Sequence, residues 1–276
     1  MQNLNNLSTF SESLPNTERM PVLFLGHGSP MNAIEENEFV TGFKNVAKIL
    51  PKPTAIICIS AHWFTNGTKV TAMEMPQTIH DFGGFPKALY EVQYPAKGNP
   101  KLAEVTKLLL EPTFVELDEK WGLDHGAWSV LRHLYPNADI PVIQLSIDYT
   151  KPALYHFELA QKLSKLRDKG ILIIGSGNIV HNLGLIDFHN FHKDDYGFDW
   201  AIEARSIFNN YLLDGNFQSL INYNKESKAI QLAIPTPEHY LPLIYTLGLK
   251  QKNEELSLFN DKLLAGSLSM TSVRIS

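Results

Sequence analysis

Apolar residues along this chain follow two alternating patterns. In the first, short continuous apolar runs end at glycine, proline or histidine, which is typical of strands buried on both faces of a sheet. In the second, apolar residues recur every three or four positions, as on one face of a helix. The first pattern predicts strands at 22–25, 55–61, 68–75, 113–117, 141–146, 171–177 and 229–234. The second predicts helices at 35–50, 99–110, 127–135, 152–169, 199–213 and 240–247, with Gly170 as the cap after 152–169.

Strands that alternate with helices predict an α/β fold with a mainly parallel central sheet covered by helices on both faces. In such sheets ligands bind at the carboxyl ends of the strands, so we expect the active site there. No repeat or linker interrupts the pattern, which favours one domain over 21–276. Residues 1–20 are rich in polar residues and lack the basic start and apolar core of a signal peptide. We expect them to form a flexible N-terminal extension.

Composition removes several classes of function. The 276 residues carry a net charge of −5, and no cluster of lysine and arginine departs from this average, so nucleic acid and anionic membranes are not expected partners. No apolar run approaches the roughly 20 residues that span a bilayer. The single cysteine, Cys58, lies inside an expected buried strand. A disulfide framework is therefore excluded, and the reducing cytoplasm is the expected location.

Histidines follow four of the predicted strands. The runs at 22–25, 55–61, 171–177 and 229–234 are followed within a few residues by His27, His62, His181 and His239. Neutral imidazole binds zinc and other first-row metals, and separate strand ends can converge on one point. The four histidines together therefore predict one shared metal ion.

Other polar residues near these positions are weaker candidates. His125 lies in a glycine-containing loop before a helix and is a fifth candidate for the same edge, unless it only tethers the loop. Glu238 adjoins His239, but neighbouring side chains rarely point the same way, so we expect only His239 to bind. His80 lies in an aromatic loop that can face the pocket. Any single histidine after a strand is more often a structural residue than a ligand. The remaining histidines are interpreted as exposed or core residues: His133, His156, His189 and His192.

Five motifs, in this order, resemble the signature of the class III extradiol ring-cleavage dioxygenases. The similarity covers nearly the whole chain from about residue 21 and is closest to the 4,5-DOPA extradiol dioxygenase branch of that family. The motifs are Gly-His-Gly-Ser-Pro at 26–30, Ser-Ala-His-Trp at 60–63, Leu-Asp-His-Gly-Ala-Trp at 123–128, Gly-Ser-Gly-Asn-Ile-Val-His-Asn-Leu at 175–183 and Pro-Thr-Pro-Glu-His-Tyr-Leu-Pro at 235–242.

The resemblance implies a non-haem Fe(II) enzyme that inserts both atoms of O₂ into a catechol such as L-DOPA, giving a 4,5-seco-DOPA-type semialdehyde. It implies one divalent metal ion held by His27, His62 and His239. His181 would be a fourth ligand or the acid/base residue, and His125 a second acid/base or substrate-orienting residue. A neutral histidine near a dication is suited to accept a catechol proton and return it during ring opening.

A site built from neutral histidines alone is also a good zinc site. We therefore expect zinc in protein made without iron precautions, and Fe(II) in the active form. Aromatic residues near the proposed ligands are candidates for packing the catechol ring, although each can equally be core. They are Trp63, Phe85, Trp128 and Tyr240.

Three other readings use the same histidines. A tetrapyrrole metal chelatase shares the Gly-His-Gly-Ser turn, but that reading leaves the motifs of His125 and His239 unexplained. A zinc-dependent hydrolase would use the cluster to activate water, without O₂. A non-catalytic metal site is the third, and it gives no role to an aromatic loop over the site.

Overall fold

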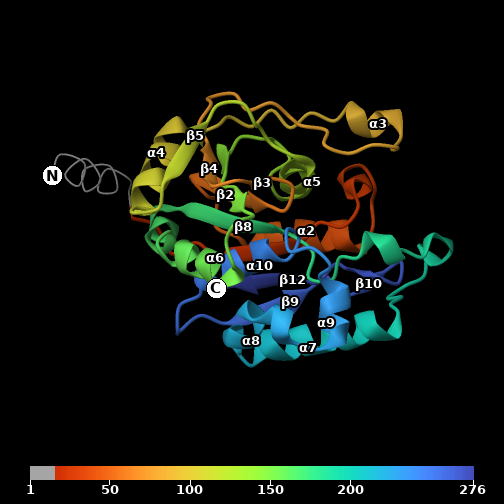
Figure 1. The fold of residues 1–276 in the computed structure, drawn as a ribbon. Coiled ribbons are helices and arrows are strands. Elements are labelled where there is room, and N and C mark those ends of the chain that lie inside the picture. Colours follow the sequence, from red (N-terminus) through yellow and green to blue (C-terminus); the bar gives the residue numbers. More distant parts are fainter. Residues whose placement is uncertain (1–15) are drawn as a thin grey trace.

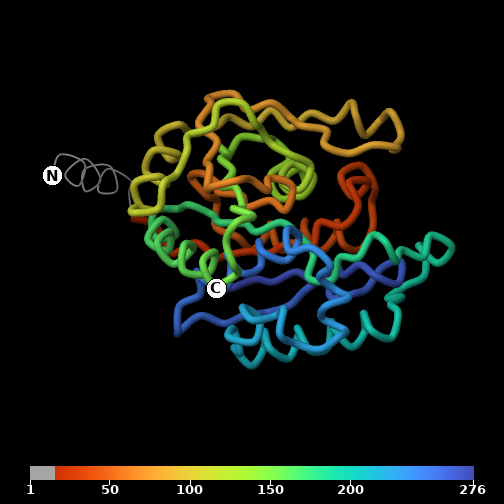
Figure 2. Tube along the Cα trace, viewed as in Figure 1, coloured from red at the N-terminus to blue at the C-terminus, as the bar shows by residue number. Residues whose placement is uncertain are grey.

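The computed structural model describes residues 16–276, which fold around a six-stranded sheet (Figure 1). Four neighbouring strands, β6, β2, β8 and β1, run parallel, and β12 and β9 continue the sheet with antiparallel pairing. Figure 2 shows the C-terminal segment returning beside the N-terminal strand. The strand bounds, in sheet order, are Val142–Gln144, Ala55–Ser60, Ile171–Gly177, Val22–Gly26, Ser272–Ile275 and Leu256–Phe259.

Helices cover both faces of the sheet, as predicted. Side chains alternate along each strand, so that in β1 Leu23 and Leu25 join one apolar cluster while Val22 and Phe24 join the other. The first cluster contains α2 (Glu38–Ile49) and α5 (His125–Leu134). The second contains helices from the rest of the chain: α4 (Pro100–Leu109), α6 (Ala153–Gln161), α7 (Asp199–Leu213), α8 (Phe217–Ile221), α9 (Lys228–Ala233) and α10 (Leu241–Gly248).

Smaller elements complete the described chain. Three two-stranded pairs are β3–β7 (Phe64–Thr65 and Ile147–Asp148), β4–β5 (Thr68–Thr71 and Val115–Asp118) and β10–β11 (Leu263–Leu264 and Leu268–Ser269). The short helices are α3 (Lys87–Tyr90) and the 3₁₀ turns η1 (Pro30–Ala33), η2 (Ser164–Lys169), η3 (Leu183–Leu185), η4 (Phe188–Asn190) and η5 (Tyr223–Lys225). None of the helices within 16–276 is long and apolar enough to cross a membrane.

One predicted strand is wrong. The run 229–234 is not a strand, because the chain forms α9 there, with the Ser227 hydroxyl accepting from the backbone N–H of Ile230 at its start. Its buried residues Ala229, Ile230 and Ala233 are spaced as on one helix face. A short apolar run has no period that separates a buried strand from a buried helix. The predicted helix at 152–169 likewise ends at Gln161 and continues as η2, and Gly170 follows with the expected left-handed φ of 75°.

The expectation of a flexible extension falls mostly on residues 1–15, which lie outside the described part of the chain. Residues 16–20 pack against η2: the Thr17 N–H donates to the carbonyl of Asp168 and the Met20 N–H to that of Arg167, and the Met20 side chain is buried. Cys58 is buried in β2, and burial raises the pKa of its thiol well above the ordinary value. That environment gives no means of activating the thiol as a nucleophile.

His156 supplies a testable pH dependence of stability. It is buried in α6, and its Nδ1 lies 3.0 Å from the hydroxyl of Tyr245. Burial lowers the pKa of His156 from 6.5 to about 4. The unfolded chain therefore binds this proton at a higher pH than the folded chain, so the stabilisation is complete above pH 6.5 and is lost as the pH falls toward 4. From pH 7 to pH 5 we expect His156 to cost about 2 kcal/mol of unfolding free energy.

Urea unfolding of the wild type and of His156→Gln at these two pH values measures this contribution. The variant should lose less stability than the wild type as the pH is lowered. Equal losses in the two proteins would contradict the assignment.

Candidate metal centre

The carboxyl edge of the parallel strands carries three of the predicted histidines. His27 follows β1 directly, His62 follows β2, and His181 comes shortly after β8. The register aligns these ends, with Gly26 opposite Gly177 on the adjacent strands. Parallel pairing therefore brings segments that are far apart in sequence to one edge, as the sequence predicted.

His239 reaches the same edge from the connection between α9 and α10. Its carbonyl accepts a hydrogen bond from the backbone N–H of Asn178, at 2.9 Å. A Cβ at Gly177 would collide with that carbonyl oxygen, so a glycine at this position lets the two backbones touch. The second Gly of the Gly-Ser-Gly motif therefore fixes where His239 enters the site.

His125 begins α5 and lies beside His62. Asp124 caps the helix: its Oδ1 accepts from the N–H of Ala127 at 3.1 Å and from the hydroxyl of Ser60 at 2.6 Å. A Cβ at Gly126 would collide with the side chains of Ser60 and His62. The absence of a side chain there lets α5 approach β2, and the His62 and His125 ring centres are 3.8 Å apart.

Three imidazole rings form a nearly equilateral triangle. The ring centres are 5.1 Å apart for His27 and His62, 5.3 Å for His27 and His239, and 5.1 Å for His62 and His239. Three imidazoles that bind one ion through a nitrogen at about 2.1 Å, at tetrahedral angles, have ring centres about 5.2 Å apart. The Nε2 atoms of His27 and His62 are 3.3 Å apart, close to the roughly 3.4 Å of the same geometry. The triangle therefore has the dimensions of a three-histidine metal site.

The other two histidines stand beside members of this triangle. His181 stacks on His239, with ring centres 3.5 Å apart and an angle of 9° between the planes. A nitrogen lone pair lies in the plane of its ring, and two nearly parallel planes at this separation do not meet near the rings, so both histidines cannot bind the same ion in their ring planes. The 3.8 Å between His62 and His125 is likewise shorter than two ligands of one tetrahedral ion have. Possible ligand atoms nevertheless lie within 4.8 Å of one another in two groups: His27, His62 and His125; and His181, Glu238 and His239.

Burial favours the neutral form of four of the rings, those of His27, His62, His181 and His239. It is the largest cause that lowers the pKa of His27 and His239 well below the ordinary value, and neighbouring histidines lower both further. It also lowers the pKa of His62 and of His181 to about 4. Neutral imidazoles are the form that binds a metal, so the cluster is ready to act as a ligand set at neutral pH.

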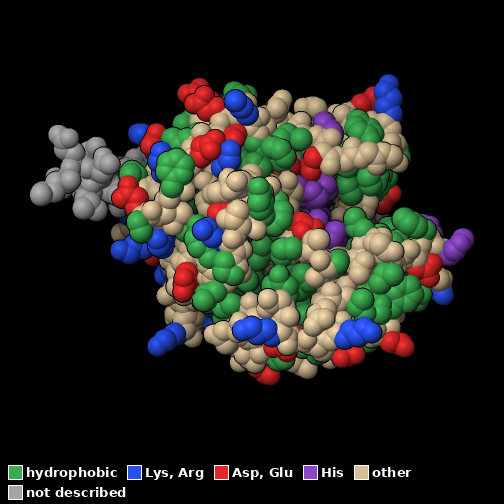
Figure 3. All heavy atoms as spheres, viewed as in Figure 1, with side chains coloured by type: hydrophobic (Ala, Val, Ile, Leu, Met, Phe, Trp, Pro, Cys, Tyr) green, Lys and Arg blue, Asp and Glu red, His purple; other side chains and the backbone are tan. Residues whose placement is uncertain are grey.

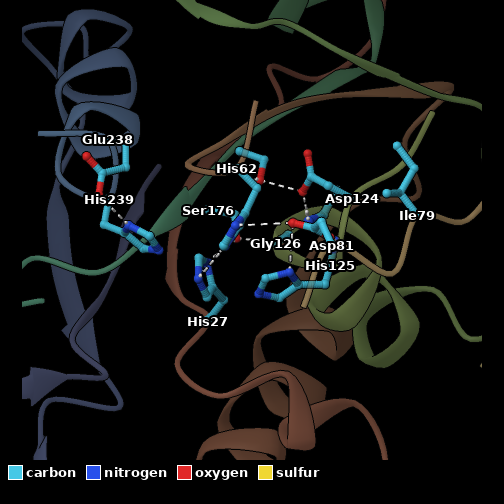
Figure 4. Close-up of polar contacts among 12 residues, drawn as sticks. His27, His62, Ile79, Asp81, Asp124, His125, Gly126, Ser176, Glu238 and His239 are labelled. Atoms are coloured by element: carbon cyan, nitrogen blue, oxygen red, sulfur yellow. Dashed lines mark hydrogen bonds and ion pairs between the residues drawn. The ribbon is translucent and has the colours of Figure 1, made fainter. Parts of the chain in front are cut away.

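The partners of the Nδ1 atoms show which nitrogen faces the centre (Figure 4). The Ser176 hydroxyl gives its hydrogen to the carbonyl of Gly126, at 2.5 Å, so it can only accept from His27 Nδ1, at 3.0 Å. His27 therefore offers the lone pair of Nε2. Glu238 Oε1 lies 3.4 Å from Nδ1 of His239 and also accepts from the hydroxyl of Thr236 at 2.7 Å. Glu238 thus stands behind His239.

Sequence reasoning missed Asp81, which lies between two of the histidines (Figure 4). Its Oδ2 is 3.2 Å from Nδ1 of His62 and 3.0 Å from Nδ1 of His125, and its Oδ1 accepts from the His125 N–H at 2.9 Å. Burial alone would raise the pKa of Asp81, but its contacts with His125 and His62 lower it overall. The only sequence signal was its place in the aromatic loop. The preceding His80 turns away, with Nε2 2.9 Å from the carbonyl of Val92.

Three of the four aromatic residues predicted for the pocket are buried. Tyr240 is buried in the helical layer, where its hydroxyl donates to the carbonyl of Leu220 at 2.9 Å. Trp128 is fully buried and donates its indole N–H to the carbonyl of Ile79 at 2.8 Å, and the buried Trp63 stacks on Trp121. A large aromatic residue that follows a metal-binding histidine in sequence can pack in the core or line a pocket. These three pack in or next to the core.

Phe82 was not predicted, and its ring centre is 5.4 Å from that of His125 and 5.4 Å from that of the partly buried Phe85. Figure 3 shows histidine side chains in a hollow of the face in view, flanked by hydrophobic side chains. A separate cavity of about 360 Å³ has none of the clustered histidines in its lining, which includes Glu36, Lys44 and Arg132.

Comparisons with known proteins agree with this site. Residues 21–266 match the family described as the catalytic LigB subunit of aromatic ring-opening dioxygenase. A protein of Escherichia coli K12 named 4,5-DOPA dioxygenase extradiol is 50% identical over 265 residues, covering 93% of this chain and 95% of that protein. A protein of Beta vulgaris with the same name is 36% identical over 261 residues, covering 92% and 95%.

A solved structure has the same fold. The crystal structure of an uncharacterized protein from Escherichia coli K12 superposes with a TM-score of 0.80 at 44% identity, covering 94% of this chain and 100% of that chain. The family match and the named relatives do not favour the hydrolase or the chelatase reading. The chain belongs to the LigB family of aromatic ring-opening dioxygenases, and within it to the extradiol enzymes.

Proposed function

We propose that this enzyme opens the ring of L-DOPA or a closely similar catechol between carbons 4 and 5, using O₂ and one Fe(II) ion per chain. The names of the relatives from Escherichia coli and Beta vulgaris support the substrate. Both atoms of O₂ enter the product, a yellow 4,5-seco-DOPA-type semialdehyde. The observation that carries the proposal is the triangle of His27, His62 and His239.

The same three residues hold the metal in this proposal. Their spacing fits one ion, and Ser176 turns the Nε2 lone pair of His27 toward the centre. His181 is assigned to proton transfer because it stacks on His239. Ferrous iron, when bound, supplies the electron chemistry with O₂ and the positive charge that favours the catecholate. Zinc suits the same neutral ligands but has no redox chemistry.

The protein's own groups bind and deprotonate the catechol. His125 and His181 are imidazoles placed beside two of the metal-binding histidines. One accepts a hydroxyl proton as the catechol binds, and one returns a proton as the ring opens. Phe82 and Phe85 give the ring an apolar surface next to His125.

The expected location is the cytoplasm, where the expected partners are the catechol and O₂. Its support is the chain's single cysteine, which is buried in β2 and can form no disulfide within the chain.

Metal exchange tests the proposal. Enzyme stripped of metal and loaded anaerobically with Fe(II) should consume O₂ and turn L-DOPA yellow. The same enzyme loaded with zinc should do neither, because zinc cannot exchange electrons with O₂. Protein made without added iron should contain zinc by elemental analysis. Equal O₂ uptake by the two forms would refute the role of iron, and no coloured product across a panel of catechols would refute the activity.

A further inference from the structure

Asp81 is placed so that one carboxylate oxygen serves two imidazoles. Oδ2 is 3.2 Å from His62 Nδ1 and 3.0 Å from His125 Nδ1, and the Asp81 side chain is 16% exposed. The His125 Nδ1 is buried, and its contact with Asp81 Oδ2 has the distance of an ion pair without the geometry of a hydrogen bond. The second oxygen, Oδ1, accepts from the backbone N–H at the start of α5. The carboxylate is therefore held by a fixed backbone while it faces both rings.

The chemistry of an ionised carboxylate decides where the ring protons lie. It has no hydrogen to donate, so each imidazole nitrogen that faces it closely must carry a hydrogen. In a neutral imidazole only one nitrogen is protonated. His62 and His125 then both carry their hydrogen on Nδ1, and both offer the lone pair of Nε2.

We infer that Asp81 is the positioning residue that sets the tautomer and the ring orientation of both His62 and His125. This inference rests on the proposed function, in which His62 binds the metal and His125 is a base. One carboxylate then prepares a metal ligand and a proton acceptor together. Carboxylates that orient metal-binding histidines in this way generally contribute 10- to 100-fold to metal affinity.

The neighbouring Asp124 shows what a structural carboxylate does in this site. It caps α5, accepts from the Ser60 hydroxyl, and accepts from the Trp121 indole N–H at 3.2 Å. No ion pair joins an imidazole of the cluster to its oxygens within residues 16–276, although its charge, like that of Asp81, acts to raise the pKa of His62. Asp81 differs because the contacts of Oδ2 are the two histidine rings.

The direct test reads the tautomers in the wild-type protein. In long-range proton–nitrogen NMR of zinc-loaded enzyme with ¹⁵N-labelled histidine, we expect His62 and His125 to be protonated at Nδ1. A proton on Nε2 of either ring would overturn the inference, and this result requires no variant.

Zinc affinity, measured by chelator competition, gives the second test. Asp81→Asn removes the negative charge and leaves one acceptor oxygen in place of the two of the carboxylate. It should weaken zinc binding about 10- to 100-fold. The control is Glu91→Gln, which removes an exposed carboxylate of the same loop that pairs with Lys87. It should leave the affinity unchanged within about twofold.

The outcomes separate this inference from the proposed function. Unchanged zinc affinity in Asp81→Asn, with His62 and His125 still protonated at Nδ1, would overturn the role of Asp81 alone. Unchanged affinity in His62→Ala would overturn the metal site itself. Weakened affinity in Asp81→Asn with folding intact by circular dichroism supports the inference.

Discussion

Replacing His239 with alanine is expected to lower both zinc affinity and the kcat/KM of the Fe(II) enzyme by more than about 100-fold. Loss of a residue that only orients a ligand already costs 10- to 100-fold, and the loss of a ligand costs more. His239 is 7% exposed, and its ring completes the triangle with His27 and His62. Removing it leaves two of the three proposed ligands.

Chelator competition for zinc and O₂ uptake with L-DOPA measure the two effects. His192→Ala is the matched control, because His192 is exposed and its ring contacts only Phe191 among the described aromatic rings. It should behave as the wild type. A His239→Ala enzyme that keeps zinc affinity and kcat/KM within about tenfold would show that the triangle is not the metal site.

His181→Ala should separate proton transfer from metal binding. We expect kcat to fall by about 10²- to 10⁴-fold, the usual contribution of a general acid or base. Zinc affinity should remain within a few-fold of wild type, because a ring stacked on His239 with 9° between the planes cannot share its ion. Single-turnover kinetics under O₂ and chelator competition measure the two quantities.

The zinc affinities of His181→Ala and His239→Ala distinguish the roles of the two histidines. The two rings stack 3.5 Å apart, yet they are expected to give opposite results for metal affinity. His181 is also the more exposed of the pair, which suits a group that exchanges protons with substrate and solvent. If His181→Ala loses zinc as strongly as His239→Ala, His181 is a ligand and the argument from stacking is wrong.

The sequence alone determined the parallel strands and the edge where the site lies. Strands β1, β2 and β8 are buried on both faces, so they must be continuously apolar, and the glycines and histidines that end them mark the carboxyl edge. The positions of His27 and His62 followed from this local pattern. The meeting of these two with His181 could also be predicted, since parallel pairing brings the strand ends together. His239 joins them although the strand predicted before it is the helix α9.

Only the tertiary structure decided how each residue is used. The helix α9 formed where a strand was expected, because a six-residue apolar run takes its conformation from what it packs against. Tyr240 is a core residue because the helices around it bury its ring, which its sequence neighbours do not show. The role of Asp81 depends on its loop folding back onto α5. The stacking of His181 on His239 depends on the position of His239, whose carbonyl oxygen packs against Gly177. These are contacts between distant segments, and they depend on packing and burial that a local pattern does not contain.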